Sequence, residues 1–447
     1  MSPLDFLRAY DPDRQALLDG ALPASPLRIE DGDCVGVVLF NLGGPASLDE
    51  VEPFLYNLLM DPALLDVPVG GRLRHWLAKS VARLRAGTLR QEYEMIGGGA
   101  PVTRLAREQA EALEGHLNAR YGEPIGARFR TFPAMRYGQP SIETAASRMA
   151  ADGVDKVVLL PSYPQYSTAT TGSAFAYWMA LADAAERPSW PTTAVQEYAA
   201  NPKYLQAVSE RIDEALQRFP QDVRDEAVLV FSAHDTALRA RSMQSDPYCC
   251  HVHSTVEQVM RLRGRDRPFY TAFQSLIGPN RWLSPATPTL LETLAEQGRR
   301  SVLVVPISFV TDHVNTTYEL DIAARAEAER RGVEHFEVTA GLNTHPLFIE
   351  ALGEATIAQL DLSVDVDQAR RDQDGQPPAY PLRSLQELPR HDLNGSSAQC
   401  PTCGRTTGAR QWARPDGREP NVSTERPAAP PNDPSGPAPD ARSRKRS

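Results

Sequence analysis

Side chains able to bind a metal or transfer a proton follow short apolar runs of this sequence. After residues 302–305 come, in order, Asp312, His313, Glu319 and Asp321. Imidazole and carboxylate groups together suit divalent iron, cobalt or zinc, and they also suit removal of a proton from a weakly acidic N–H. We therefore expect a metal site or an acid–base site here, although a charged helix start would explain the carboxylates equally well.

A second such group is His234, which follows the apolar residues 228–231 after Ser232 and Ala233. A lone histidine more often packs or forms hydrogen bonds than binds a ligand. A histidine at the end of a buried strand, however, lies at the edge where open α/β sheets bind their ligands. A third run, 157–160, leads into Tyr163 and Tyr166. Three polar strand ends predict one common cleft.

Buried strands and helices alternate along most of the chain. The pattern predicts strands at 35–40, 127–132, 157–160, 227–231, 269–273, 301–306 and 335–339. Such alternation gives parallel sheets with right-handed crossovers, and the likeness of 156–161 to 301–306 indicates two similar halves. The predicted fold class is α/β, with two Rossmann-like doubly wound parallel-sheet domains that face each other across a cleft.

The length of 447 residues favours two folded domains plus additional segments. We expect an N-terminal extension outside the core, a first domain with an apolar lip at 58–69, a second domain, and a proline-rich, mostly disordered tail that cannot offset its chain entropy by apolar burial. The predicted boundaries are 1–34, 35–200, 201–361 and 362–447.

Composition excludes several classes of function. A net charge of −10 argues against a nucleic-acid binder that relies on neutralising phosphates. The sequence has no run of about 18 apolar residues and no basic-then-apolar leader, so we expect a cytoplasmic protein. Five cysteines without regular spacing do not suggest a disulfide framework.

The apolar lip 58–69 is too short to span a bilayer, and a basic stretch, predicted to be helical, follows it. The basic residues are Arg72, Arg74, His75, Lys79, Arg83, Arg85 and Arg90. An apolar lip beside a basic helix fits a peripheral membrane contact, and it fits a core segment followed by a solvated helix as well. Aromatic residues near the strand ends could line a large flat ligand or form ordinary core.

Motifs in the order found here resemble those of the ferrochelatase family, whose members insert ferrous iron into a porphyrin. The similarity covers about Val35 to Leu360. The matching motifs are Asn41-Leu-Gly-Gly-Pro45, Tyr93 with Ile96-Gly-Gly-Gly99, Met135-Arg-Tyr137, Tyr163-Pro-Gln-Tyr-Ser167, Phe231-Ser-Ala-His234, Asp246-Pro-Tyr248, Gln274-Ser275 with Trp282-Leu283, Asp312-His313 and Tyr318-Glu-Leu-Asp321. Each motif is weak alone, but together they are specific.

The resemblance implies a porphyrin held in the cleft and iron delivered beside His234, which would bind the metal or accept a pyrrole proton. His313, Glu319 and Asp321 would complete the catalytic group. The residues expected to contact the porphyrin are Leu42, Tyr93, Arg136, Tyr137, Tyr163, Tyr166, Ser167 and Trp282. Arg136 would pair with a propionate. Leu42 resembles the branch that uses protoporphyrin IX.

The sequence departs from the family where a glutamate normally follows the Asp-His pair, because Asn315 stands there. An amide oxygen can bind iron but cannot take a proton at neutral pH. We expect Glu319 and Asp321 to carry the proton or metal traffic, and His234, Asn315 and Glu319 to be the metal ligands. A catalytically weak porphyrin or haem carrier, or a chelatase for another porphyrin or metal, is the alternative.

We expect no resident cofactor, with ferrous iron as a substrate. Cys400 and Cys403 resemble part of the cysteine set of cluster-bearing ferrochelatases, but a [2Fe–2S] cluster needs four ligands and the other two cysteines do not match, so we do not expect one. The expected partners are a porphyrin, ferrous iron, a membrane surface by peripheral contact and a second copy in a homodimer, but no nucleic acid.

Overall fold

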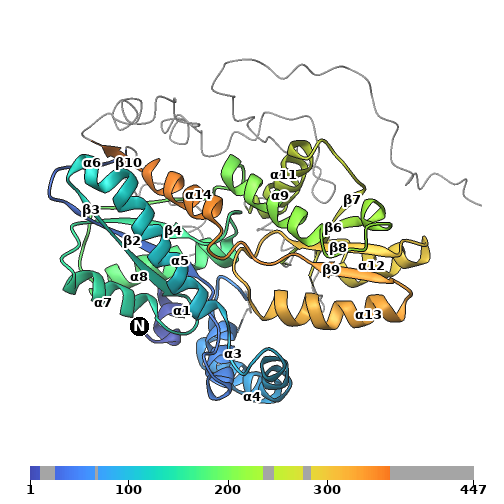
Figure 1. The fold of residues 1–447 in the computed structure, drawn as a ribbon. Coiled ribbons are helices and arrows are strands. Elements are labelled where there is room, and N and C mark those ends of the chain that lie inside the picture. The colour runs from blue at the N-terminus through green and yellow to red at the C-terminus, as the bar shows by residue number, and fades with distance from the viewer. Residues whose placement is uncertain (11–25, 66–68, 235–245, 275–282, 363–447) are drawn as a thin grey trace, which may run out of the picture. The chain divides into compact units, whose positions relative to one another are not determined.

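The computed structural model describes residues 1–10, 26–65, 69–234, 246–274 and 283–362 (Figure 1). All of them belong to one compact unit, Met1–Trp412, and the second unit, Ala413–Ser447, lies outside the described residues. The predictions for Trp282, for Cys400 and Cys403, and for the tail beyond residue 362 therefore fall outside the described structure as well.

The first half of the chain forms a four-stranded parallel sheet. Its strands are β2 (Cys34–Asn41), β3 (Arg128–Met135), β4 (Lys156–Pro161) and β5 (Thr192–Ala194), in the order β3-β2-β4-β5. Every residue of β2 is buried, because helices cover both faces of a parallel sheet and leave no face for water. The apolar runs 35–40 and 157–160 are confirmed as strands.

The second half repeats this topology. Its strands are β6 (Val228–Ala233), β7 (Phe269–Phe273), β8 (Ser301–Pro306) and β9 (His335–Val338), in the order β7-β6-β8-β9. In each sheet an inner strand comes first along the chain (β2 or β6). The edge strand on one side of it follows (β3 or β7), and then the strand on its other side (β4 or β8). The predicted α/β class with parallel sheets is confirmed, and β6 and β8 flank the point where the winding reverses.

Helical segments connect and cover the strands (Figure 1). They are α1 (Pro3–Ala9), η1 (Leu48–Glu50), α3 (Val51–Met60), α4 (Gly71–Met95), α5 (Val102–Leu117), η2 (Asn118–Gly122), α6 (Glu123–Ile125), α7 (Ile142–Ala151), η3 (Thr168–Gly172), α8 (Ser173–Asp183), α9 (Pro202–Leu216), η4 (Arg224–Glu226), α11 (Tyr248–Leu262), α12 (Thr287–Glu296), η5 (Asn315–Ala324), α13 (Arg325–Arg330) and α14 (Pro346–Ile357). The segments η2, η3 and η5 are π-helical, which the sequence pattern did not predict.

The N-terminal residues contribute to the core, so our expectation that they lie outside it is wrong. Phe6 of α1 and Ile29 of β1 (Leu27–Ile29) are each 1% exposed, and β1 pairs in parallel with β10 (Leu360–Leu362). One buried cluster includes residues of both four-stranded sheets, among them Val37 and Leu303. The two sheets thus share one core, and the domain boundary at residue 200 stays a prediction.

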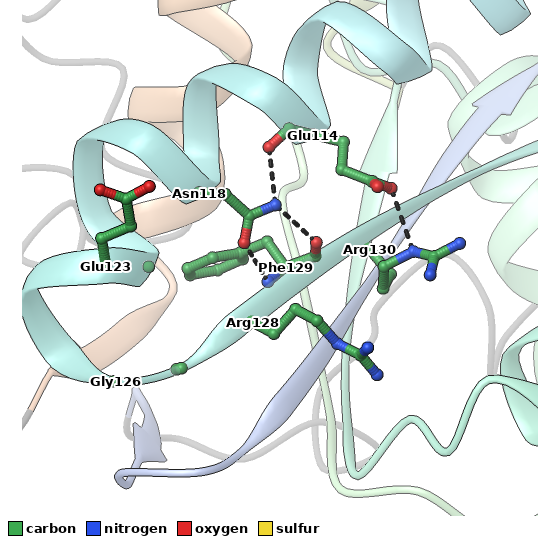
Figure 2. A pocket seen from close by; sticks show the side chains of 9 residues that line it. Glu114, Asn118, Glu123, Gly126, Arg128, Phe129 and Arg130 are labelled. Atoms are coloured by element: carbon green, nitrogen blue, oxygen red, sulfur yellow. Dashed lines mark hydrogen bonds and ion pairs between the residues drawn. The ribbon is translucent and has the colours of Figure 1, made fainter.

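The outer edge of β3 is closed by side chains rather than by another strand. Asn118 accepts a hydrogen bond from the Phe129 N–H at 2.9 Å and donates to the Phe129 carbonyl at 2.8 Å. Glu114 accepts from the Thr131 N–H at 2.8 Å. The next outward position is Pro133, which has no N–H. Figure 2 shows Asn118 between Glu114 and Phe129. These contacts block pairing with a foreign strand.

Candidate active site

His234 lies at the end of β6, at the reversal point of the second sheet. Its backbone N–H donates to the Ser308 hydroxyl at 2.7 Å, and its carbonyl accepts from the Tyr248 hydroxyl at 2.9 Å. These contacts fix the backbone and leave the half-buried imidazole free to project from the strand end. Its Nδ1 is buried and has no hydrogen-bond partner among the residues that the structure describes.

The environment of His234 keeps its ring neutral. Burial lowers the pKa of His234 to about 4, and His313 acts in the same direction, while the Gln274 amide opposes them. The Phe309 ring packs edge-on against the imidazole, with 5.3 Å between ring centroids. At neutral pH the side chain therefore has a free lone pair, which can bind a metal or accept a proton.

His313 is held at both ring nitrogens. Nε2 lies 3.0 Å from the Gly43 carbonyl oxygen, and Nδ1 lies 3.0 Å from the side-chain oxygen of Asn315. Phe309 stacks on the ring with an interplanar angle of 6°. His313 is 3% exposed, and burial lowers its pKa. It connects the segment after β8 to the segment after β2.

The hydrogen-bonding capacity of His313 constrains the Asn315 amide. A carbonyl can only accept, so Nε2 of His313 carries a proton and donates to Gly43. Nδ1 of the neutral ring then carries a lone pair and can only accept a hydrogen bond. Its partner must therefore be the amide N–H of Asn315 rather than the amide oxygen. Rotating the amide satisfies this, since its two ends are exchangeable. The rotated amide turns its oxygen away from His313.

Glu319 lies in η5, the same segment as Asn315. Burial raises the pKa of Glu319, and the nearby Glu92 raises it further, while the Asn315 contact lowers it. Asn315 and Glu319 thus belong to one π-helical segment, a helix type frequent at functional sites, and His313 lies just before it.

Asp321 pairs with a neighbouring arginine instead. Its carboxylate accepts from Arg325 at 2.6 Å, and its side chain is 49% exposed. Asp312 likewise serves its own loop, where it accepts from the Gly341 N–H and from the Asn343 amide. The structure therefore brings Glu319 together with His313 and Asn315 but leaves Asp321 in a surface ion pair.

Arg136 is already paired with a carboxylate inside the protein. Its guanidinium donates to Asp61 at 2.6 Å, and the Asp61 side chain is completely buried. Tyr137 and Ser173 also donate to this carboxylate at 2.6 Å each. Asp61 thus compensates the positive charge of Arg136, the charge that we expected to pair with a porphyrin propionate. Sequence reasoning missed Asp61, because nothing in its neighbourhood along the chain marks it.

The other predicted porphyrin contacts come from several elements. Tyr93 of α4 is fully buried, and its hydroxyl has no hydrogen-bond partner among the described residues. Burial raises the pKa values of Tyr93, Tyr163 and Tyr166, so these side chains are neutral phenols. Ser167 donates to Asp246 at 3.2 Å. Leu42 follows β2 next to Gly43 and is half-buried.

Two cavities lie away from His234. One of about 420 Å³ is lined by residues near the N-terminal end of β3, including Glu114, Arg128 and Arg130 (Figure 2). The other, of about 440 Å³, is lined by residues that include Asp61 and Arg136. The segments 235–245 and 275–282, which adjoin the ends of β6 and β7, lie outside the described residues. The width of the expected porphyrin slot therefore stays a prediction.

Comparison with known proteins gives a consistent result. The ferrochelatase family model matches residues 34–360. The ferrochelatase of Synechococcus elongatus is 39% identical over 321 residues, which are 72% of this chain and 81% of that protein. The ferrochelatase of Gloeobacter violaceus is 38% identical over 331 residues, covering 73% and 98% of the two chains.

Among solved structures, SirB from Bacillus subtilis with Fe³⁺ aligns with a TM-score of 0.40 and 13% identity, over 73% of this chain and 95% of that one. CbiX, described as the terminal enzyme for biosynthesis of sirohaem in denitrifying bacteria, aligns with a TM-score of 0.38 and 12% identity, over 73% of this chain and 99% of that one.

The two parallel sheets of equal topology, with a neutral histidine at the reversal point of the second, define a doubly wound α/β protein with a ligand-binding strand edge. The match of the family model to most of the folded chain, together with relatives near 39% identity, places it more narrowly. The chain belongs to the ferrochelatase family.

Proposed function

We propose that this chain inserts ferrous iron into protoporphyrin IX to give protohaem and releases two protons. The observation that carries the proposal is the neutral imidazole of His234 at the reversal point of the second sheet. Iron forms bonds to four pyrrole nitrogens while two pyrrole N–H bonds break. A group near the macrocycle with a free lone pair is needed to accept those protons or to hold the arriving metal.

We assign His234 as the first proton acceptor or iron ligand. Glu319, with Asn315 beside it, would pass protons or iron along η5. Glu319 supports this role because burial raises its pKa and so favours its protonated form. Tyr93, Tyr137 and Tyr163 would contribute apolar surface to the macrocycle site. No resident cofactor is part of this proposal, and the iron is a substrate.

The test is anaerobic turnover of ferrous iron and protoporphyrin IX, followed by loss of porphyrin fluorescence. His234→Ala should lower kcat by at least about 100-fold, the size of a lost acid–base group. His335→Ala, at the start of β9, is the matched control and should keep the wild-type rate. Porphyrin binding without turnover by the unaltered chain would instead identify a carrier, and a His234→Ala rate within twofold of wild type would contradict our assignment.

We further propose that the protein is cytoplasmic and docks on anionic membrane surfaces through α4. The exposed apolar residues of this helix include Leu73, Trp76, Leu77, Val81 and Leu84, with Trp76 63% and Leu84 82% exposed. At about 100° per residue they form one stripe, and Arg72, Lys79, Arg83 and Arg90 lie beside it. No helix in the described part of the chain is long and apolar enough to cross a membrane.

The apolar lip itself supplies little of this surface. Met60 is 1% and Ala63 8% exposed, and the buried Arg74 donates to the Leu59 and Asp61 carbonyls. Flotation with phosphatidylserine-containing vesicles tests the contact. Trp76→Glu combined with Leu84→Glu should abolish flotation, and Leu262→Glu, at an exposed apolar site on α11, should not. A shift from dimer to monomer in the double variant without loss of flotation would make α4 a homodimer interface instead.

A further inference from the structure

Gln274 lies beside His234 at the ends of neighbouring strands. The β6–β7 pair ends with Ala233 opposite Phe273, and the Gln274 N–H donates to the Ala233 carbonyl at 2.7 Å. His234 and Gln274 are therefore the next two residues in register. Residues opposite each other in a parallel pair project to the same face, with the strands about 4.8 Å apart. The imidazole and the amide are side-chain neighbours.

Both side chains have buried polar atoms without hydrogen-bond partners among the described residues. Gln274 is 3% exposed, and neither its amide nitrogen nor its amide oxygen has a partner within the described part of the chain. Nδ1 of His234 is in the same condition. An unpaired buried polar group costs about 1–3 kcal/mol, and such groups are rare in folded proteins. Two of them side by side require an explanation beyond packing.

The Gln274 amide can meet the imidazole as a donor or as an acceptor, because it carries both N–H groups and a carbonyl oxygen. Nδ1 is the ring nitrogen that is buried without a partner among the described residues. If Nδ1 carries the proton, the lone pair of the neutral ring lies on Nε2. A neutral imidazole carries only one N–H, and histidines that bind metals usually donate their other ring N–H to a neighbouring acceptor.

We propose that Gln274 is the positioning residue of His234: its amide oxygen accepts the Nδ1–H and so keeps the lone pair on Nε2, directed at the iron or the pyrrole nitrogen. This rests on the proposed function of His234. A small rotation of the two side chains brings the amide oxygen into contact with Nδ1. Gln274 would thereby set which ring nitrogen reacts without touching the porphyrin or the iron itself.

Two variants of the full chain test this. Gln274→Leu keeps the size but removes the acceptor, and it should lower kcat about 10- to 100-fold while KM for protoporphyrin stays within twofold. Gln274→Glu keeps an acceptor and should retain at least a third of the wild-type kcat. Gln206→Leu on the exposed face of α9 is the control. Equal loss in both Gln274 variants, or no loss in Gln274→Leu, would overturn the proposal.

A second measurement does not depend on turnover. Histidine-selective ¹⁵N labelling, with the His234 signals assigned by their loss in His234→Ala, reports which ring nitrogen is protonated in the metal-free protein. We expect protonation at Nδ1 in the wild type and loss of this preference in Gln274→Leu. Protonation at Nε2 in the wild type would refute the proposal even if Gln274→Leu fails to fold. If the wild-type protein does not insert iron, only the proposed function is refuted, because the NMR signals report the tautomer of His234 independently of turnover.

Discussion

Nε2 of His313 lies 3.0 Å from the carbonyl oxygen of Gly43, 270 residues earlier in the chain. This hydrogen bond ties the end of β8 in the second sheet to the end of β2 in the first. Because Asn315 holds Nδ1, both ring nitrogens of His313 are engaged. Of the two histidines that the sequence singles out, His313 is thus suited to hold the strand ends together, and His234 is suited to meet the substrate.

Asn315 and Glu319 should respond oppositely to substitution. Asn315→Glu places an ionisable acceptor next to His313 and should raise turnover, since a carboxylate can take the proton that an amide cannot. Glu319→Gln should lower turnover by about one to a few orders of magnitude. Steady-state iron insertion measures both, with Glu329→Gln on α13 as control. An unchanged rate in Glu319→Gln would exclude Glu319 from proton transfer.

The pH dependence should show the lowered pKa of His234. Because the working form is the neutral ring and the pKa is about 4, kcat/KM should stay level from pH 8 to pH 6 and fall only toward pH 4 to 5. An ordinary histidine would already be half protonated at about pH 6.5. Stopped-flow fluorescence with pH-jump mixing measures this. If kcat/KM falls to half its maximum already near pH 6.5, the lowered pKa of His234 is contradicted.

The free energy of unfolding should also depend on pH through His234. The unfolded chain protonates His234 at about pH 6.5, whereas the folded chain resists protonation down to about 4. The unfolded state therefore binds more protons in this window, so the free energy of unfolding should decrease as the pH falls from 6.5 toward 4. Urea unfolding at several pH values measures this. The free energy of unfolding should change less steeply with pH in His234→Phe than in the wild type.

The buried pair of Arg136 and Asp61 should be structural. Arg136→Leu leaves the Asp61 carboxylate buried without its cation, which should lower the free energy of unfolding by about 3–5 kcal/mol. Adding Asp61→Asn should restore part of that loss, because the uncompensated charge is removed. Urea unfolding measures both. If Arg136→Leu instead raises only KM for protoporphyrin and leaves stability unchanged, the predicted propionate contact is supported.

Removing the side chains that close the edge of β3 should promote association. Asn118→Ala leaves the N–H and the carbonyl of Phe129 without their partner, and should cost about 1–3 kcal/mol of unfolding free energy. The exposed edge should also increase light scattering on mild heating. Asn57→Ala on α3 is the control. Wild-type scattering and stability in Asn118→Ala would show that water replaces the side chain without penalty.

Sequence alone determined the parts of this protein that depend on neighbouring residues. The apolar runs that became β2, β6 and β8 were identifiable because a strand buried on both faces must be largely apolar. His234 was identifiable because the residue after such a strand lies at the ligand-binding edge of the sheet. Family motifs added the reaction, since they are matched residue by residue along the chain.

Only the tertiary structure decided which polar groups meet. Arg136 pairs with Asp61, 75 residues away, and His313 with Gly43, and no local pattern encodes either contact. The pairing of β1 with β10 brings together segments from the two ends of the folded region. The pKa of His234 likewise depends on burial by distant segments. Chain order fixes local conformation, but a hydrogen bond or a desolvated charge depends on distance in space, which exists only after folding.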